Sequence, residues 1–334
     1  MDARRFKRGG IDEYQANCQV TRTRGMDGLL FASRNPAMAA LLEAAERAAA
    51  GDTTILLTGE SGTGKDVLAR QIHRWSPRRE HPFVVINCAN LAEALFENEL
   101  FGHRKGAFTG ASNDQPGRLE AAKGGTVLFD EIADLPTSLQ AKFLRFVEER
   151  SFERVGGGTI KVDVRLIAAS NRDLEAESAA GRFRQDLFYR INVITFSLPP
   201  LRDRPQDILP LASIVLTHIS TRLNRAQPRL AAQVAEALAR YRWPGNLREL
   251  HNVLGRAAIL SNVNTLTVHD LPEPIRYPAA GAVLGNAHEA KLKDLEREHI
   301  LHVLAESETL GQAAATLGIA ATTLWRKRKQ YGIG

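Results

Sequence analysis

Short apolar runs alternate with helical patterns along much of this chain up to about residue 200. Five of these runs are rich in β-branched and aromatic residues, and each predicts a buried strand: Thr54–Leu57, Phe83–Asn87, Thr126–Asp130, Val164–Ala169 and Val193–Leu198. Strands that alternate with helices usually pair in parallel. Residues 29–203 therefore predict an α/β subdomain built on a parallel five-stranded sheet.

Helical periodicity replaces this alternation after residue 203. Apolar positions recur at helical spacing over three stretches: Ile208–Ile219, Leu230–Tyr241 and Leu247–Leu260. Residues 204–271 thus predict an all-helical subdomain in which strands are absent. The stretch 272–288 is rich in Pro, Gly and Ala, as linkers are, and helical patterns resume over residues 289–334. Residues 1–28 are polar and unpatterned, which predicts a short N-terminal arm.

Composition excludes two classes of protein. Cys18 and Cys88 are the two cysteines of the 334 residues, too few for a disulfide framework. No apolar run approaches the roughly 20 residues needed to cross a bilayer, and no apolar segment follows the cations of Met1–Gly10, so we expect a cytoplasmic protein. The net charge of +6 permits a polyanionic partner. Four cations are consecutive at Arg326–Lys329, and no acidic residue follows Glu308.

A glycine-rich loop follows the first predicted strand and precedes a helix: Gly59, Glu60, Ser61, Gly62, Thr63, Gly64, Lys65 and Asp66. Glycines let backbone N–H groups wrap phosphates, and the helix N-terminus adds positive potential. We expect Lys65 to reach the β- and γ-phosphates of ATP. The alternative is a plain turn, which the lysine at the helix start disfavours. Asp66 stands where Ser or Thr usually binds Mg²⁺, so that position lacks the hydroxyl ligand.

Two carboxylates, Asp130 and Glu131, end the strand Thr126–Asp130. Such a pair can hold Mg²⁺ through Asp130 and polarise a water molecule through Glu131. Adjacent acids also occur where a solvated loop begins. The lysine-containing loop upstream favours the catalytic interpretation, so the two motifs together predict an ATPase that uses ATP and Mg²⁺.

Between these motifs lies a hexapeptide of small residues around one aromatic ring: Gly106, Ala107, Phe108, Thr109, Gly110 and Ala111. Alone it is an ordinary turn, but in a nucleotide-hydrolysing domain it becomes an arm that presents Phe108 to a partner. With the two motifs it resembles the central domain of bacterial sigma-54-dependent transcriptional activators, which are enhancer-binding AAA+ ATPases. The resemblance covers roughly residues 29–334. It implies an AAA+ P-loop domain with an α-helical lid, and a hexapeptide that contacts the sigma-54 factor.

The resemblance also assigns polar residues around the nucleotide. Asn87 matches a residue that restrains the catalytic glutamate, although from the sequence it could equally cap its strand. Ser170 and Asn171 match the polar sensor of the γ-phosphate. Arg248 matches the second sensor, which lies in the lid.

Further arginines match positions that act on other subunits or on the loop. Arg184 and Arg190 match candidate arginine fingers, which act in trans on a neighbouring subunit. Six residues apart, they do not share a helical face, so the sequence leaves open which one is the finger. Arg154 belongs to a predicted hairpin expected to work with the hexapeptide.

The C-terminus predicts a helix-turn-helix: Leu310–Leu317, a turn at Gly318 and Ile319, and Ala320–Tyr331. Ala313 and Ala314 are small, as a close helix crossing requires. The second helix resembles the recognition helix of Fis-type DNA-binding domains and exposes Thr322, Thr323, Arg326, Arg328 and Lys329. A capped surface helix is the alternative. We expect Trp325 to anchor the core and the helix Leu292–Leu304 to dimerise.

Taken together, these features predict a sigma-54-dependent activator that binds double-stranded DNA upstream of promoters. A ring, expected to be a hexamer, would use ATP hydrolysis to convert the closed promoter complex to the open one. The alternatives are a DNA-binding regulator that binds ATP without remodelling, and a general ring ATPase that acts on DNA structure. Only about 28 residues precede the ATPase, whereas a receiver domain needs on the order of 100. The resemblance is therefore to the activators that lack one, and the alternative is a truncated sequence.

Overall fold

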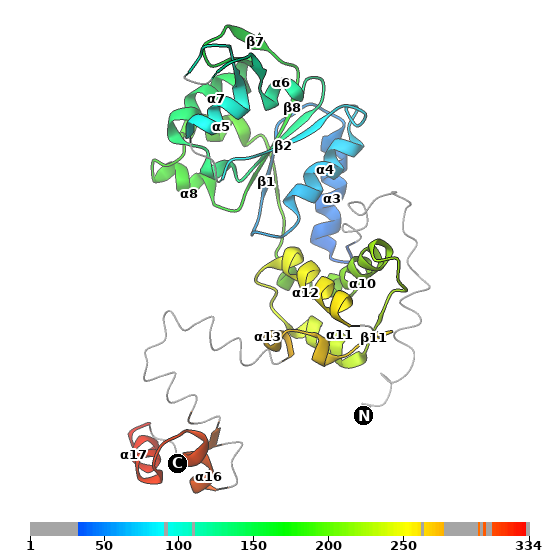
Figure 1. Cartoon of the computed structure of the whole chain (residues 1–334), viewed down its shortest axis with the longest axis vertical. Helices are drawn as coiled ribbons and strands as arrows, with labels where there is room; N and C mark the ends of the chain where they lie inside the picture. Colours follow the sequence, from blue (N-terminus) through cyan, green and yellow to red (C-terminus); the bar gives the residue numbers. More distant parts are fainter. Residues whose placement is uncertain are drawn as a thin grey trace. The chain divides into compact units, whose positions relative to one another are not determined.

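The computed structural model describes residues 33–89, 93–108, 111–261, 264–276, 300, 303–304 and 309–331. It separates into two compact units that divide after Asp270, and each is described by itself (Figure 1). In the described part of the chain, no helix is both long and apolar enough to span a membrane.

A five-stranded sheet forms the centre of the first unit. Its strands, in spatial order, are β2 (Phe83–Asn87), β5 (Thr126–Asp130), β8 (Arg165–Ser170), β1 (Ile55–Thr58) and β9 (Ile194–Ser197). All four neighbouring pairs run parallel. The five predicted strands are these five, so the predicted parallel sheet is confirmed.

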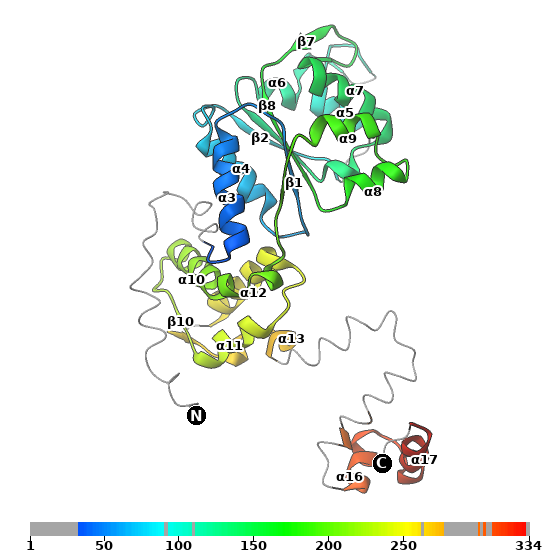
Figure 2. The same ribbon diagram turned by 180° about the vertical axis from the view of Figure 1, so that it is seen from behind.

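Helices cover both faces of this sheet (Figure 2). On one face α3 (Pro36–Ala49) and α4 (Lys65–Trp75) pack against side chains such as Leu128 and Ile167. On the other face α5 (Glu93–Phe101), α7 (Thr137–Glu149) and α9 (Gln185–Ile191) pack against the alternate positions Val127 and Phe129. Because successive side chains of a strand point to opposite faces, one apolar run contributes side chains to the hydrophobic cores on both faces of the sheet.

Two small antiparallel hairpins extend from this subdomain. One pairs β3 (Gly102–His103) with β4 (Gln115–Pro116), followed by α6 (Arg118–Ala121). The other pairs β6 (Ser151–Glu153) with β7 (Thr159–Lys161), which confirms the hairpin predicted around Arg154. Short elements complete the subdomain: η1 (Ile132–Asp134) and α8 (Leu174–Ala179).

The lid follows the last strand of the sheet. Its elements are η2 (Leu201–Asp203), α10 (Pro205–Arg222), β10 (Arg229–Leu230), α11 (Ala232–Arg240), α12 (Asn246–Leu260), β11 (Thr265–Leu266) and η3 (Val268–Asp270). The three predicted helical stretches lie on α10, α11 and α12. The expectation that strands are absent here is wrong, because β10 and β11 pair in parallel. Trp243 is fully buried in the lid and donates its indole N–H to the Leu238 carbonyl (2.9 Å).

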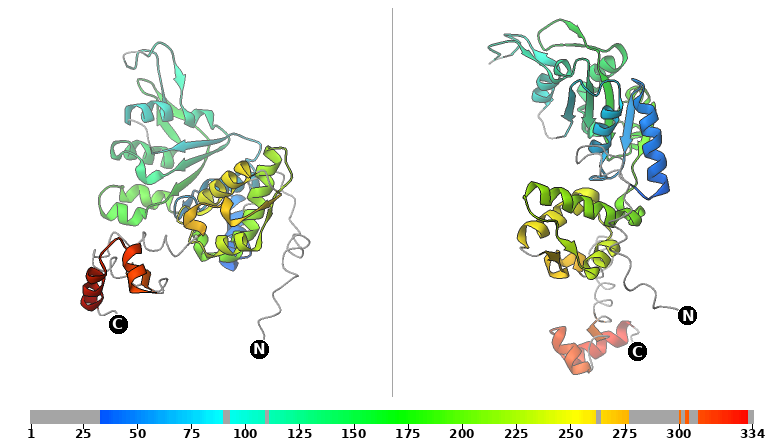
Figure 3. Two further views of the ribbon diagram at one scale, coloured as in Figure 1. Left: turned by 60° about the horizontal axis from the view of Figure 1, so that its bottom comes forward. Right: turned by 90° about the vertical axis from the view of Figure 1, so that its right-hand side faces the viewer.

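The second unit contains the predicted helix-turn-helix. Within the described residues, its helices with defined bounds are α13 (Glu273–Arg276), which begins inside the stretch predicted as linker, α16 (Leu310–Thr316) and α17 (Ala321–Tyr331). Figure 3 shows α16 and α17 side by side. Gly318 has a φ of +64°, which a turn between close helices favours.

A small core holds these two helices together. Ala313, Ala314 and Leu324 are buried in it with Ile300 and Val303. The expectation for Trp325 is wrong: its side chain is 58% exposed, because Leu324, one position earlier on α17, takes the inward direction. Most of the predicted dimerisation helix Leu292–Leu304, namely residues 292–299 and 301–302, lies outside the described residues.

Candidate functional site

The glycine-rich loop joins β1 to α4 in a conformation that only glycine fits. Gly59, Gly62 and Gly64 have φ values of +142°, +78° and +101°. A Cβ on Gly59 would lie 2.7 Å from the Leu198 carbonyl oxygen, and one on Gly62 would lie 2.4 Å from that of Gly245. The loop therefore packs tightly against neighbouring backbone on its outer side.

Lys65 is buried at the start of α4, with 5% of its surface exposed. Its Nζ donates to the carbonyls of Gly59 (2.8 Å) and Glu60 (3.2 Å). Burial lowers the pKa of Lys65, while Glu131 and Asp130 counteract that shift. A desolvated ammonium inside a phosphate-binding loop can exchange these carbonyl contacts for phosphate oxygens.

The two carboxylates lie beside this lysine. Burial raises the pKa of Asp130, and the charge of Lys65 opposes the effect. Glu131 follows in a left-handed conformation (φ +53°), and its backbone N–H donates to Asp130 Oδ1 (3.1 Å). Such a φ is uncommon for a residue other than glycine. The Glu131 carboxylate accepts the Asn171 N–H at Oε2 (3.1 Å).

The carboxylates of the site suit a Mg²⁺ ion that binds together with a nucleotide. No group of three or more His, Cys, Asp or Glu side chains suited to a metal occurs among the described residues. Mg²⁺, however, is usually held by one or two carboxylates together with substrate phosphates and water. The charge of Asp66 contributes to the raised pKa of Asp130, and both carboxylates oppose the lowering of the Lys65 pKa, so the two carboxylates and the lysine lie near one another.

The polar residues at the strand ends lie beside the two carboxylates. Asn87 lies opposite Asp130 in the sheet, and its Oδ1 accepts the Ala89 N–H (2.8 Å), as a strand cap does. Asn171 donates its backbone N–H to Glu131 (3.1 Å), and its role as a phosphate sensor stays a prediction. Ser170 is fully buried, and its hydroxyl bonds to the backbone of Arg172 on both the donor and acceptor side.

Lid residues reach the glycine-rich loop directly. Arg248 donates from Nη1 to Ser61 Oγ (2.8 Å), which places the predicted second sensor beside the loop. Sequence reasoning missed three other residues here: Arg202 pairs with Glu60 (2.6 Å), Arg204 donates to the Thr63 carbonyl (3.2 Å), and Asn246 donates to the Ser61 carbonyl (3.0 Å). Of these three, Asn246 alone lies in a motif that the sequence singles out, Trp243–Leu250, two positions before Arg248.

The two candidate fingers differ in their surroundings. Arg184 immediately precedes α9, where Asp186 binds its guanidinium twice (3.0 and 2.7 Å) and raises its pKa. Arg190 lies near the other end of α9 and is exposed, and within the described residues no acidic side chain pairs with it. Burial lowers the pKa of the neighbouring Arg150, and the charge of Arg190 lowers it further. The cation of Arg190 is thus left available for an anion from elsewhere.

The hexapeptide projects from the hairpin β3–β4. Gly106 has a φ of +82° and its N–H donates to the Ala111 carbonyl (2.9 Å), which closes the base of the loop. Phe108 is 45% exposed, and its ring lies 4.9 Å from that of His103. Thr109 and Gly110 lie outside the described residues.

The second hairpin supports the base of this loop. The Arg104 N–H donates to the Val155 carbonyl (3.0 Å). A Cβ on Gly156 would lie 2.8 Å from that of Ala107, so the backbones touch closely. Arg154 is anchored by an ion pair with Glu120 and is mostly buried. The hairpin that carries Arg154 therefore touches the base of the hexapeptide through backbone contacts, and its cooperation with the hexapeptide stays a prediction.

The predicted DNA-binding side chains share one helix. Thr322, Thr323, Arg326 and Lys329 on α17 are exposed, and Arg328 is half-buried. Lys329 Nζ lies 5.5 Å above the ring of Trp325. The exposed Trp325 thus joins a cationic surface and not the core.

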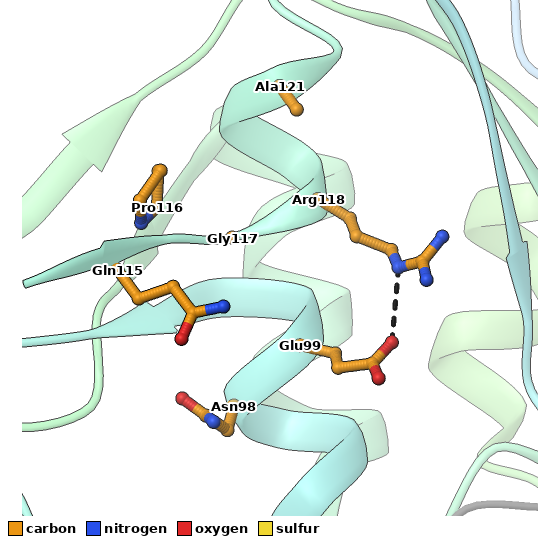
Figure 4. Close-up of a pocket in the computed structure, with 7 residues that line it drawn as sticks. All are labelled: Asn98, Glu99, Gln115, Pro116, Gly117, Arg118 and Ala121. Atoms are coloured by element: carbon orange, nitrogen blue, oxygen red, sulfur yellow. Dashed lines mark hydrogen bonds and ion pairs between the residues drawn. The ribbon is translucent and has the colours of Figure 1, made fainter. Parts of the chain in front are cut away.

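Two pockets lie away from the glycine-rich loop. One has a volume of about 270 Å³, and its lining includes Arg118 and Glu99, which form an ion pair (3.1 Å; Figure 4). The other, of about 310 Å³, follows the edge strand β2 and includes Asn87. Neither of these two pockets is lined by Lys65, Asp130 or Glu131.

Comparison with protein families covers the same three parts of the chain. The family described as "Sigma-54 interaction domain" matches residues 31–197. "AAA+ ATPase lid domain" matches residues 202–286, and "Bacterial regulatory protein, Fis family" matches residues 291–331.

Individual proteins agree with these matches. The chain is 50% identical over 309 residues to the alginate biosynthesis transcriptional regulatory protein AlgB of Pseudomonas aeruginosa, covering 92% of this chain and 68% of AlgB. Crystal structures of NtrX from Brucella abortus with ADP and with ATP both match with a TM-score of 0.67, at 32% and 31% identity. They cover 90% and 96% of this chain, and 68% and 72% of NtrX. The parallel sheet, the lid and the helix-turn-helix thus each have a counterpart, and the chain belongs to the bacterial sigma-54-dependent transcriptional activators.

Proposed function

We propose that this activator is an Mg²⁺-dependent ATPase that remodels sigma-54 RNA polymerase from the closed to the open promoter complex. The observation that carries the proposal is the presence in one subdomain of Lys65, Asp130 and Glu131 together with the half-exposed ring of Phe108. The NtrX structures with ADP and ATP support nucleotide binding. A regulator that binds ATP without remodelling has no use for an exposed ring on a hinged loop, and neither has a general DNA-directed ring ATPase.

Each residue of the site has a separate chemical task in this proposal. Lys65 and the loop N–H groups bind the β- and γ-phosphates, with Arg248 beside them. Asp130 would hold Mg²⁺, which supplies neutralisation of phosphate charge. Glu131 accepts a proton from the attacking water molecule, and its hydrogen bond from Asn171 fixes the carboxylate. The polar groups Asn87 and Ser170 support the strand ends at which these residues lie.

The whole function is tested by measuring ATP hydrolysis with and without sigma-54 RNA polymerase on a premelted promoter. Remodelling predicts ATP-dependent open complexes and hydrolysis that requires Lys65. ATP binding without hydrolysis would support the non-remodelling regulator. Hydrolysis stimulated by DNA alone, with no response to sigma-54, would support the general ring ATPase.

We further propose that the active form is an oligomeric ring, expected to be a hexamer, and that Arg190 is the finger which acts in trans. Arg184 is occupied by Asp186, whereas Arg190 is exposed and electrostatically repelled by Arg150. Arg190→Ala should keep nucleotide binding and lower turnover on the order of 100-fold, as loss of one transition-state donor does.

Mixing two inactive variants tests this assignment. Subunits carrying Arg190→Ala retain Glu131, and subunits carrying Glu131→Gln retain Arg190, so their shared sites become complete in a mixed ring. Turnover should reappear on mixing. The matched control is Arg184→Ala mixed with Glu131→Gln. If only that control pair regains turnover, Arg184 is the finger.

We also propose that α17 binds DNA upstream of the promoter. Removing residues 288–334 should abolish specific DNA binding and leave ATP hydrolysis, because the removed residues all lie in the second compact unit. Binding by the whole chain should weaken steeply with salt, since cations displace counterions from phosphates.

Footprinting at several salt concentrations measures both effects. Arg326→Ala should weaken binding and reduce the salt slope by about 1. Arg79→Ala, an exposed arginine of the first unit, is the matched control and should change neither. A footprint that persists in the truncated chain would show that DNA binds elsewhere.

A further inference from the structure

The glycine-rich loop is held from its outer side by a continuous series of hydrogen bonds. Four consecutive loop residues take part, and each is bonded by a residue of η2, its flanks or the start of α12. Glu60 binds Arg202, the Ser61 carbonyl accepts from Asn246, the Gly62 carbonyl accepts from the Leu247 N–H (2.9 Å), and the Thr63 carbonyl accepts from Arg204. The carbonyls of Ser61, Gly62 and Thr63 are thereby bonded to the lid, while within the loop the Thr63 N–H donates to the Glu60 carbonyl (3.3 Å).

The side-chain amide of Asn246 connects two of these loop residues, Glu60 and Ser61, to Leu201. The Asn246 side chain is fully buried, and its backbone has a φ of +52°, a conformation that asparagine tolerates better than most residues. Oδ1 accepts the Leu201 N–H (2.7 Å), and Nδ2 donates to the Ser61 carbonyl (3.0 Å) and to Glu60 Oε2 (3.3 Å). Because a backbone N–H can only donate and a carbonyl can only accept, the orientation of the amide is fixed by its partners.

The surroundings make a neutral amide the fitting group here. Glu60 is ionised and held by two hydrogen bonds from Arg202, which lower its pKa, and Asn246 adds to that effect. A carboxylate at position 246 would have no proton to donate to Ser61 and would face both a carbonyl and the Glu60 charge. Burial and the like charge would also raise its pKa.

We propose that Asn246 is a positioning residue for the nucleotide: it locks the Ser61 carbonyl away from the phosphate site and ties the loop to Leu201 at the base of the lid. The loop is thereby arranged for phosphate before ATP binds, which increases affinity by reducing the ordering needed on binding. Because α12 begins at Asn246, movement of the lid is transmitted to the loop through the same amide. This inference rests on the proposed ATP binding.

The substitution Asn246→Asp separates positioning from a general structural role. Aspartate has nearly the same shape and can still accept the Leu201 N–H, but it donates only when protonated. At about pH 8 the variant should bind a fluorescent ATP analogue about 10- to 100-fold more weakly than the wild type, the loss expected for one buried polar contact replaced by repulsion. As the pH falls to about 5.5, the carboxyl group gains its proton and the ratio of affinities should return toward 1.

Asn246→Gly is the matched control, because glycine accepts the left-handed backbone and supplies neither hydrogen bond. Its affinity should be reduced by a factor that does not depend on pH. Adding Glu60→Gln to Asn246→Asp removes the like charge, so the recovery should shift to lower pH. Thermal melting of each variant without nucleotide checks that it is folded at every pH used.

Each result decides the matter. A pH-dependent recovery in Asn246→Asp alone supports the positioning role. Wild-type affinity in folded Asn246→Gly, or an equal and pH-independent loss in both variants, overturns it and leaves the proposed ATPase function standing. A wild-type chain that binds no nucleotide overturns both.

Discussion

Replacing Lys65 by alanine is expected to abolish measurable nucleotide binding, whereas Glu131→Gln should leave binding intact and stop turnover. Lys65 is the buried cation of the loop, and each charged hydrogen bond to phosphate is worth about 1.5–3 kcal/mol. Two lost phosphate contacts weaken affinity by about 100-fold or more. In the proposed mechanism Glu131 has a different task, because it acts on the attacking water molecule and not on the bound phosphates.

The glutamine variant isolates the charge of Glu131. Its amide oxygen can still accept the Asn171 N–H, so the backbone around the left-handed residue should be undisturbed. Loss of a general base usually lowers turnover by about 10²- to 10⁴-fold. Fluorescence titration with an ATP analogue and steady-state phosphate release measure the two quantities separately.

Lys142→Ala is the matched control for the lysine, since Lys142 is 60% exposed on α7 and pairs with Glu97. It should bind and hydrolyse ATP as the wild type does. Near-normal phosphate release from Glu131→Gln would remove Glu131 from the mechanism, and tight nucleotide binding by Lys65→Ala would remove the lysine.

The sheet and the loop could be predicted because their signals are local. The five strands of the sheet stand out as continuous apolar runs, although the edge strands β2 and β9 are only partly buried, and the glycines and Lys65 of the loop lie close together in the sequence. The expectation for Trp325 failed because an aromatic residue near a helix centre is equally compatible with either face. The pair β10–β11 was missed because each strand has two residues, too few for a periodic pattern.

The site residues that the sequence did not predict depend on contacts between positions far apart in the chain. Arg202 meets Glu60, 142 positions away, and Asn246 meets Ser61, 185 positions away. An arginine in a polar stretch is usually a surface residue, so nothing local marks Arg204 as buried, yet it is 1% exposed and burial lowers its pKa. Asn87 and Asn171 are a second example. Both lie at the ends of strands, but the sequence does not show which of them contacts Glu131, because that depends on the fold.

Phe108→Ala is expected to lose capture of sigma-54 in the presence of a transition-state nucleotide analogue, and open-complex formation with it. Phe108 has no part in the proposed phosphate chemistry, so basal ATP hydrolysis should persist. Its ring is 45% exposed and rests on His103, which is buried and hydrogen-bonded to Asn98 (2.6 Å). The ring therefore has an aromatic neighbour on the hairpin, tilted by 58° to it, and its exposed part is available for an apolar contact.

The competing explanation is that Phe108 stabilises the fold and that its loss unfolds the subdomain. Removing a half-exposed ring with one aromatic neighbour should cost about 1 kcal/mol, or a fall in Tm of about 2–4 °C. Leu95→Ala on α5 is the matched control: Leu95 is 48% exposed and lies outside the hexapeptide. It should show a similar small change in Tm and retain sigma-54 capture.

The two variants together give a decision that neither gives alone. Equal Tm values with capture lost only in Phe108→Ala would assign the ring to the partner contact. A much larger fall in Tm for Phe108→Ala would assign it to the fold, and undiminished open-complex formation would exclude it from remodelling. His103 explains why the contact role is expected: a buried, hydrogen-bonded support holds the ring in place before the partner arrives, so less conformational entropy is lost on contact.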